Sequence, residues 1–140
     1  DLAVAVLANK INDPTFGDKY GFAGVQMRSP TIIEIPFRTN EFQSEVSKWA
    51  VKYHLIKPAN NPGKVNFNGL NAAGLKVQVV TLDPLSVTKV LPDANNEVQI
   101  TLPAVNQSIY LVVTRDNKGP DGSATYIVSN VSESVGNPGD

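Results

Sequence analysis

The sequence predicts an all-β protein, an antiparallel β-sandwich of jelly-roll or Ig-like type with about eight to ten short strands. Most of its apolar stretches are short and rich in valine, isoleucine and aromatic residues. Turn-forming Pro, Gly, Asn or Asp residues bound these stretches, which follow one another roughly every ten residues. In addition, 10 prolines and 10 glycines interrupt every long stretch that could form a helix.

The predicted strands cover residues 2–8, 21–27, 31–37, 46–57, 64–67, 75–82, 86–90, 97–102, 108–115 and 124–131. At 140 residues and 15.0 kDa the chain has the size of one domain. We therefore expect a single sandwich domain over residues 1–132. Residues 133–140, ESVGNPGD, have the composition of a flexible tail or linker.

The first predicted strand, LAVAVLA at residues 2–8, is apolar on both faces. It is much shorter than the ~20 residues that span a bilayer, so no membrane insertion is expected. A terminal strand of this kind can pair within its own sheet or be lent to a neighbouring molecule. Self-assembly through residues 1–8 is therefore the alternative interpretation, with the protein as a structural subunit of a pilus, capsid or surface assembly.

The segment EVSKWAVKYHLIK alternates clearly between two faces. Trp49 and Tyr53 share one face, which is predicted to point inward, and His54 lies on the opposite, outward face. A helix over the front half of this region is the alternative, because Phe42, Val46, Trp49 and Tyr53 are spaced by four, three and four residues.

The last two predicted strands, residues 108–115 and 124–131, are separated by a stretch rich in Asp, Asn, Gly and Lys. The first of them is apolar on both faces and is predicted to be a central strand. The stretch between them has turn chemistry, which predicts a hairpin with a solvated loop. A calcium loop is the alternative, but Lys118 and Pro120 stand where oxygen ligands would be needed.

The segment NQSIYLVVT, within residues 106–114, resembles the final core strand of accessory β-sandwich modules of secreted bacterial hydrolases and adhesins. The resemblance implies a module outside the cytoplasm, extracellular or at the cell surface, that accompanies a larger secreted protein. It covers a short strand only, and no site residue is transferred from it.

Charge and cysteine content narrow the classes of partner. Twelve basic and 13 acidic residues give a net charge of −1, so nothing in the composition attracts nucleic acid. The chain has no cysteine, which excludes disulfides, thiolate metal sites and cysteine nucleophiles. No metal site and no cofactor are expected.

Catalytic motifs are missing from the sequence. His54 is the only histidine, no G-x-S-x-G nucleophile motif occurs, and sequence spacing does not pair any two carboxylates. No catalytic residue is predicted. A small hydrolase that uses His54 as its base is the least favoured interpretation.

The candidate ligand-binding residues are aromatic, because an exposed ring can stack on the face of a sugar while neighbouring amides bind its hydroxyls. They are Tyr20, Phe22, Tyr53 and Tyr110. The sequence thus favours a non-catalytic module that binds a glycan or a protein.

Overall fold

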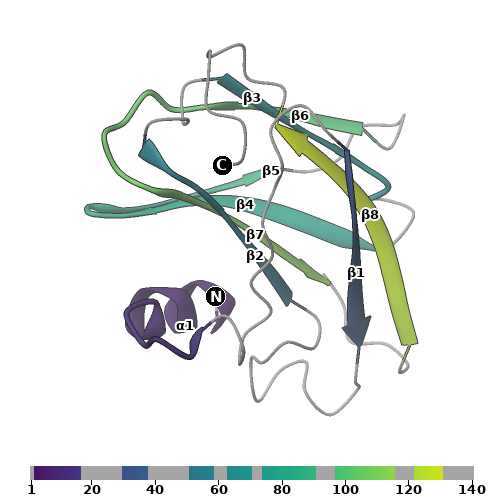
Figure 1. Cartoon of the computed structure of the whole chain (residues 1–140), viewed down its shortest axis with the longest axis horizontal. Helices are drawn as coiled ribbons and strands as arrows, with labels where there is room; N and C mark the ends of the chain where they lie inside the picture. Colours follow the sequence, from purple (N-terminus) through teal and green to yellow (C-terminus); the bar gives the residue numbers. More distant parts are fainter. Residues whose placement is uncertain are drawn as a thin grey trace.

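The computed structural model describes residues 2–16, 30–37, 51–58, 63–70, 74–90, 97–115 and 122–130. Within these ranges the chain forms one helix and eight strands (Figure 1). The elements are α1 (Leu2–Lys10), β1 (Thr31–Phe37), β2 (Val51–Ile56), β3 (Gly63–Asn68), β4 (Leu75–Leu82), β5 (Leu85–Val90), β6 (Glu97–Leu102), β7 (Ile109–Arg115) and β8 (Gly122–Asn130).

The strands form two four-stranded sheets in which every pairing is antiparallel. One sheet has the order β1-β8-β3-β6 and the other has the order β2-β7-β4-β5. Successive strands change sheet at every connection except the one from β4 to β5, which is a hairpin. This arrangement is an eight-stranded jelly roll. The predicted antiparallel β-sandwich is confirmed.

The predicted hairpin near the C-terminus is wrong. β7 pairs with β2 and β4, whereas β8 pairs with β1 and β3, so the two strands belong to different sheets. The prediction of β7 as a central strand is confirmed, because it has a neighbour on each side. Residues 116–121, for which a solvated loop was predicted, lie outside the described ranges.

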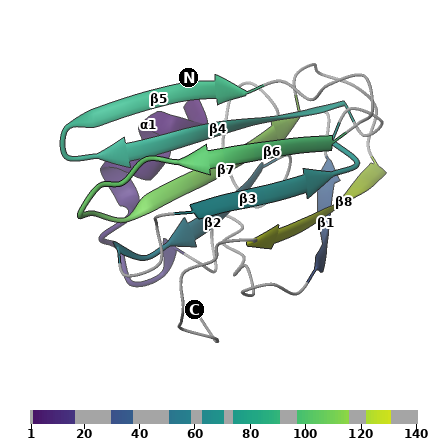
Figure 2. The same cartoon turned by 90° about the horizontal axis from the view of Figure 1, so that it is seen from above.

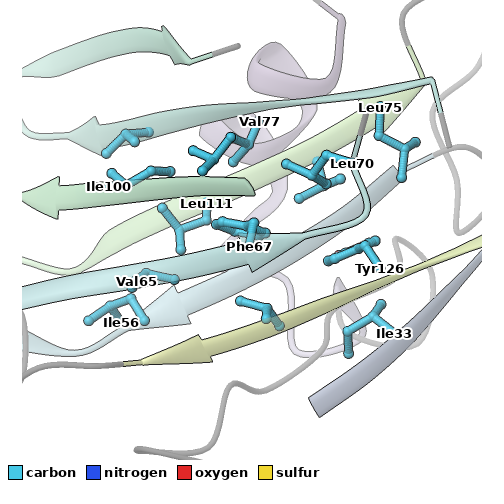
Figure 3. Packing of buried hydrophobic residues seen from close by; sticks show 14 of the residues in the cluster. Ile33, Ile56, Val65, Phe67, Leu70, Leu75, Val77, Ile100, Leu111 and Tyr126 are labelled. Atoms are coloured by element: carbon cyan, nitrogen blue, oxygen red, sulfur yellow. The ribbon is translucent and has the colours of Figure 1, made fainter. Parts of the chain in front are cut away.

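Alternation of apolar and polar residues determines which face of a strand points into the interior. β6 is the clearest case, since Val98, Ile100 and Leu102 are buried while the residues between them are exposed. Buried side chains of both sheets, nearly all aliphatic, meet in one interior cluster (Figure 3). Its labelled members are Ile33, Ile56, Val65, Phe67, Leu70, Leu75, Val77, Ile100, Leu111 and Tyr126.

Residues 2–8 were predicted to be a strand, but they form most of helix α1. Ala3, Val4 and Leu7 are buried and Ile11 is half-buried, a spacing of three to four residues that suits one helical face. α1 lies beside the β2-β7-β4-β5 sheet (Figure 1). These side chains pack on the outer face of that sheet, against Val51 and other buried residues. The helix replaces the strand because alanine and leucine have high helix propensity and this sheet face is apolar.

The helical terminus also bears on self-assembly. Lending a terminal strand to a neighbour requires residues 1–8 to be extended. In this structure residues 2–8 are helical and packed on the chain's own sheet, so the fold gives that route no support.

Some predictions fall outside the described ranges, namely the strand at residues 21–27, the front half of 46–57 with Trp49, and the tail at 133–140. Among the residues that are described, no helix is long and apolar enough to cross a bilayer.

Candidate functional site

Two of the four predicted ligand-binding residues, Tyr20 and Phe22, lie outside the described ranges. Tyr53 and Tyr110 lie on the outer face of the β2-β7-β4-β5 sheet, in the cluster of side chains that packs against α1. The structure therefore brings these two tyrosines to the same face of the molecule. That face carries the helix.

Tyr53, which was named as a candidate for stacking on a ligand, is fully buried. Its hydroxyl donates a hydrogen bond of 2.8 Å to the carbonyl oxygen of Ala3 in α1. Its ring packs against Phe16, with the ring centroids 5.2 Å apart. Tyr53 thus faces the helix rather than the interior between the sheets, and in this structure its ring is closed to a ligand.

Tyr110 is half-buried and retains part of its surface. Burial raises the pKa of its hydroxyl above the ordinary value. Its position on β7 is opposite Val80 of β4, which is in turn opposite Val87 of β5. A role of Tyr110 in binding stays a prediction.

His54 was expected on an outward face, and this is wrong. It is fully buried, and its Nε2 lies 2.6 Å from the hydroxyl oxygen of Tyr126. Its ring also lies near Phe67, with the centroids 6.3 Å apart. Both neighbours belong to the interior cluster. Alternation alone could not decide between the faces of β2, because the interior supplies a polar partner for the histidine.

A hollow that could hold a ligand lies elsewhere in the described part of the chain, along strands β4, β5 and β6. β5 and β6 are edge strands of the two different sheets, and the cleft between them is open to solvent. Its volume is about 540 Å³, which falls in the usual range for small-ligand sites, ~300–1,000 Å³. Figure 2 shows β5 at the margin of the molecule, with β4 next to it and β6 on the far side of β4 in that view. We call this hollow the β5–β6 cleft.

The polar residues among those that line the β5–β6 cleft are four with hydroxyl groups and one with an amide. They are Thr81, Ser86, Thr88, Gln99 and Thr101. Hydroxyl and amide groups both donate and accept hydrogen bonds, so they can match backbone amides or other neutral polar groups of a ligand. The hydroxyl of Thr81 already donates to the carbonyl oxygen of Pro84, at 3.1 Å.

The other described residues of the lining are apolar, and no described residue that lines the cleft is charged. The apolar members are Val79, Val90, Ile100, Leu102 and Pro103. These described residues offer no charged partner to an ionised group of a ligand, which would lose part of its hydration on entering the cleft.

The cleft exists because the inner face of β5 is polar. Ser86 and Thr88 are paired with Thr81 and Val79 of β4, whose side chains face the other sheet. At these positions a closed sandwich would need large aliphatic residues, whereas Ser86 and Thr88 remain exposed. The two sheets therefore stay apart at this edge.

The side chain of Gln107 stabilises the turn between β4 and β5, at one end of the cleft. The amide of Gln107 forms two hydrogen bonds with the backbone of Asp83, in the β4–β5 turn. Its oxygen accepts from the Asp83 nitrogen at 3.0 Å, and its nitrogen donates to the Asp83 carbonyl oxygen at 2.7 Å. These two hydrogen bonds thus connect the β4–β5 hairpin to the segment before β7.

Sequence reasoning identified none of the cleft residues. The available signal was the segment LSVTKV, in which serine and threonine alternate with leucine, valine and lysine. Either set of residues could have faced inward, and only the pairing with β4 shows that the hydroxyl set does. Among the described residues, no group of three or more His, Cys, Asp or Glu side chains could hold a metal ion.

Comparison with known proteins gives likeness of fold only. No protein-family model matches the chain, and no curated protein matches it in sequence. One similar solved structure is PliG from Aeromonas hydrophila, a periplasmic inhibitor of g-type lysozyme. It has a TM-score of 0.50 and 11% sequence identity over 80% of this chain and 97% of that one.

A second similar structure is the pre-peptidase C-terminal domain of a collagenase from Bacillus anthracis. It has a TM-score of 0.45 and 13% identity over 79% of this chain and 93% of that one.

Proposed function

We propose that this protein is a non-catalytic β-sandwich module that acts outside the cytoplasm and binds a protein ligand in the β5–β6 cleft. The observation that carries the proposal is the cleft itself, an open hollow of about 540 Å³ whose described lining residues are all neutral, either polar or aliphatic. Such a lining suits neutral polar and apolar groups, which a polypeptide segment offers in alternation.

A protein ligand is favoured over a glycan because the described residues that line the cleft include no aromatic residue. Sugar sites stack a ring on the face of the pyranose. In the described part of the chain, Phe16, Tyr53, Phe67 and Tyr126 are buried, and Tyr110 lies half-buried on the outer sheet face near α1. A glycan ligand is therefore the second outcome that the experiment below must separate.

Two features support a role without catalysis. His54, the one histidine of the chain, is buried in the sandwich interior, where a substrate in solution does not reach its ring. Among the described residues that line the cleft, none has an ionisable side chain that could transfer a proton. The cleft therefore offers the means to bind a ligand and lacks the usual means to transform it.

The proposed location, extracellular or at the cell surface, continues the expectation from the sequence. A protein of similar fold, the lysozyme inhibitor from Aeromonas hydrophila, is periplasmic. A jelly roll without catalytic function is compatible with an accessory position in a larger secreted protein. Fractionation of cells that express the full gene product tests the location directly.

Selection of ligands from a phage-displayed library of random peptides tests the binding function. We expect enriched peptides that bind the wild-type protein and fail to bind a Thr88→Arg variant, because the long charged side chain fills the cleft. The matched control is Ile32→Arg, which places the same side chain on β1 at a position that is 72% exposed. The control should bind like the wild type.

The contrary results are equally specific. Peptides that bind Thr88→Arg as tightly as the wild type place the ligand outside the cleft and overturn the proposal. A second contrary result is that no peptide is enriched, while a polysaccharide column retains the wild-type protein but not the Thr88→Arg variant. The ligand is then a glycan, and the proposal of a protein ligand is wrong.

A further inference from the structure

β5 is an edge strand whose two faces are both exposed. It pairs with β4 on one side, and in the described part of the chain no strand pairs with its other side. Five of its six residues are exposed and Val90 is half-buried. In an antiparallel ladder, alternate residues direct their N–H and C=O groups to opposite sides. Half of the backbone groups of β5 therefore point away from β4 and are available to a further strand.

Two of the other edge strands, β1 and β2, are less suited to accept a further strand. β1 contains Pro36, which has no N–H to donate, and proline is a common device for blocking an edge. β2 is largely covered on both faces, with four of its six residues buried. β5 carries no proline, and its one charged residue is Lys89.

The side chains of β5 divide cleanly between two environments. Ser86, Thr88 and Val90 line the β5–β6 cleft. Leu85, Val87 and Lys89 alternate with them and therefore lie on the outer face of the sheet. Leu85 is 58% exposed and Val87 is 43% exposed, although both are apolar.

We propose that β5 accepts an extended segment of a partner protein as an additional antiparallel or parallel strand, a mode of recognition that rests on the binding function proposed above. Backbone hydrogen bonds to the free edge of β5 supply affinity. Alternate side chains of the added strand enter the β5–β6 cleft and are uncharged, because the described residues that line the cleft are neutral. Those on the other face lie beside Leu85 and Val87 and include an acidic residue that pairs with Lys89.

Charge and size favour a partner protein over a second copy of this chain. A lysine on an edge strand disfavours pairing between identical edges, while it attracts an acidic residue on a different strand. A strand of six residues buries little surface compared with the ~1,200 Å² of a stable complex. The complex is accordingly of the weak, transient kind.

The test uses a synthetic peptide with threonine and valine at alternate positions and leucine and glutamate at the others. Two further versions of the peptide carry N-methyl groups on the backbone. In one version the threonine and valine residues are methylated, and in the other the leucine and glutamate residues are. Because a strand directs alternate N–H groups to one neighbour, strand addition predicts that one methylated version loses binding by at least about tenfold. The other version should bind within about twofold of the parent peptide.

A charge exchange tests the predicted orientation of the faces. Lys89→Glu should weaken binding of the glutamate peptide by up to about fivefold, and a peptide with lysine in place of glutamate should recover it. Lys89→Gln is the matched control, which removes the charge without reversing it. Titration calorimetry measures each affinity.

Each outcome has a distinct meaning. If both methylated peptides bind alike while Thr88→Arg abolishes binding, strand addition is overturned and the binding function of the cleft stands. If the parent peptide does not bind at millimolar concentration, while peptides from the library do bind in the cleft, strand addition is again overturned. If the protein dimerises as its concentration rises, and Lys89→Glu changes this dimerisation, the free edge of β5 binds a second copy of the chain. The proposal of a different partner protein would then be overturned. If neither kind of peptide binds, the proposed function fails as well.

Discussion

Nε2 of His54 lies 2.6 Å from the hydroxyl oxygen of Tyr126, and this hydrogen bond joins the two sheets across the buried interior. His54 belongs to β2 and Tyr126 to β8, so the bond connects strands that share no backbone pairing. The rings meet edge to face, with centroids 5.8 Å apart and planes at 85°. A polar pair of this kind is stable in an apolar interior because each group satisfies the other.

Replacement of Tyr126 by phenylalanine should lower the free energy of unfolding by about 1–3 kcal/mol, because it removes this hydrogen bond inside the interior. Denaturant unfolding followed by circular dichroism measures the change. Tyr110→Phe is the matched control and should cost less than about 0.5 kcal/mol, since this tyrosine is half-buried. Equal effects of the two changes would contradict a special role of the interior bond.

The stability of the fold should decrease at high pH because of Tyr126. Burial raises the pKa of its hydroxyl well above the ordinary value of 10.0. Above about pH 10 the unfolded chain therefore loses this proton while the folded chain keeps it, so the unfolded state binds fewer protons and the free energy of unfolding falls as pH rises. The slope approaches about 1.4 kcal/mol per pH unit for one proton.

Unfolding measured between pH 8 and pH 11 tests this dependence. The Tyr126→Phe variant is the control, and its stability should fall less steeply over the same interval. A profile as steep as that of the wild type would show that another group controls the alkaline loss of stability.

Tyr53→Phe should loosen helix α1 without unfolding the sandwich. The change removes the hydrogen bond to the carbonyl oxygen of Ala3 and leaves the ring in contact with Phe16. We expect a loss of about 0.5–1.5 kcal/mol, expressed as faster hydrogen exchange in residues 2–10. Exchange in β7 should change little. An unchanged exchange rate in α1 would show that the helix is held without this bond.

Leu7→Ala should destabilise the protein by about 2–5 kcal/mol, the usual cost of a cavity at a fully buried leucine. Leu85→Ala makes the same chemical change at a residue that is 58% exposed, and it should cost under about 0.5 kcal/mol. Thermal unfolding of the two variants gives the comparison. Similar costs would mean that α1 does not pack on the sheet in solution.

Gln107→Ala should free the turn between β4 and β5. The two hydrogen bonds from the Gln107 amide to Asp83 are lost together. Because they lie near solvent, we expect a loss of about 0.5–1.5 kcal/mol and faster exchange of the Asp83 amide proton. Gln107→Glu keeps the oxygen that accepts from the Asp83 nitrogen but lacks the donor, so it should fall between the wild type and the alanine variant.

Much of the secondary structure could be predicted because it depends on neighbours in the chain. Residues 97–102 alternate apolar and polar side chains with a period of two, which any single covered sheet face produces. The segment at 109–115 is apolar on both faces, and this pattern requires a strand with cover on both sides. These local patterns were sufficient for the all-β class and for the position of most strands.

Partner choice, in contrast, depends on residues far apart in sequence. Nothing in the composition of β7 and β8 shows that they join different sheets, because an apolar strand face packs equally well in either. The segment at 2–8 is apolar throughout, so its periodicity does not separate helix from strand. The helix forms because it packs on the apolar outer face of the β2-β7-β4-β5 sheet.

In the candidate site, too, some features depend on the local sequence pattern and others on long-range packing. The alternation of serine and threonine with apolar residues in β5 was visible in the sequence. Whether the hydroxyls face solvent or the opposite sheet depended on the register with β4. His54 faces the interior because Tyr126, 72 positions away in the chain, supplies its hydrogen bond. Local pattern established which segments are strands, and long-range packing established what each of their faces meets.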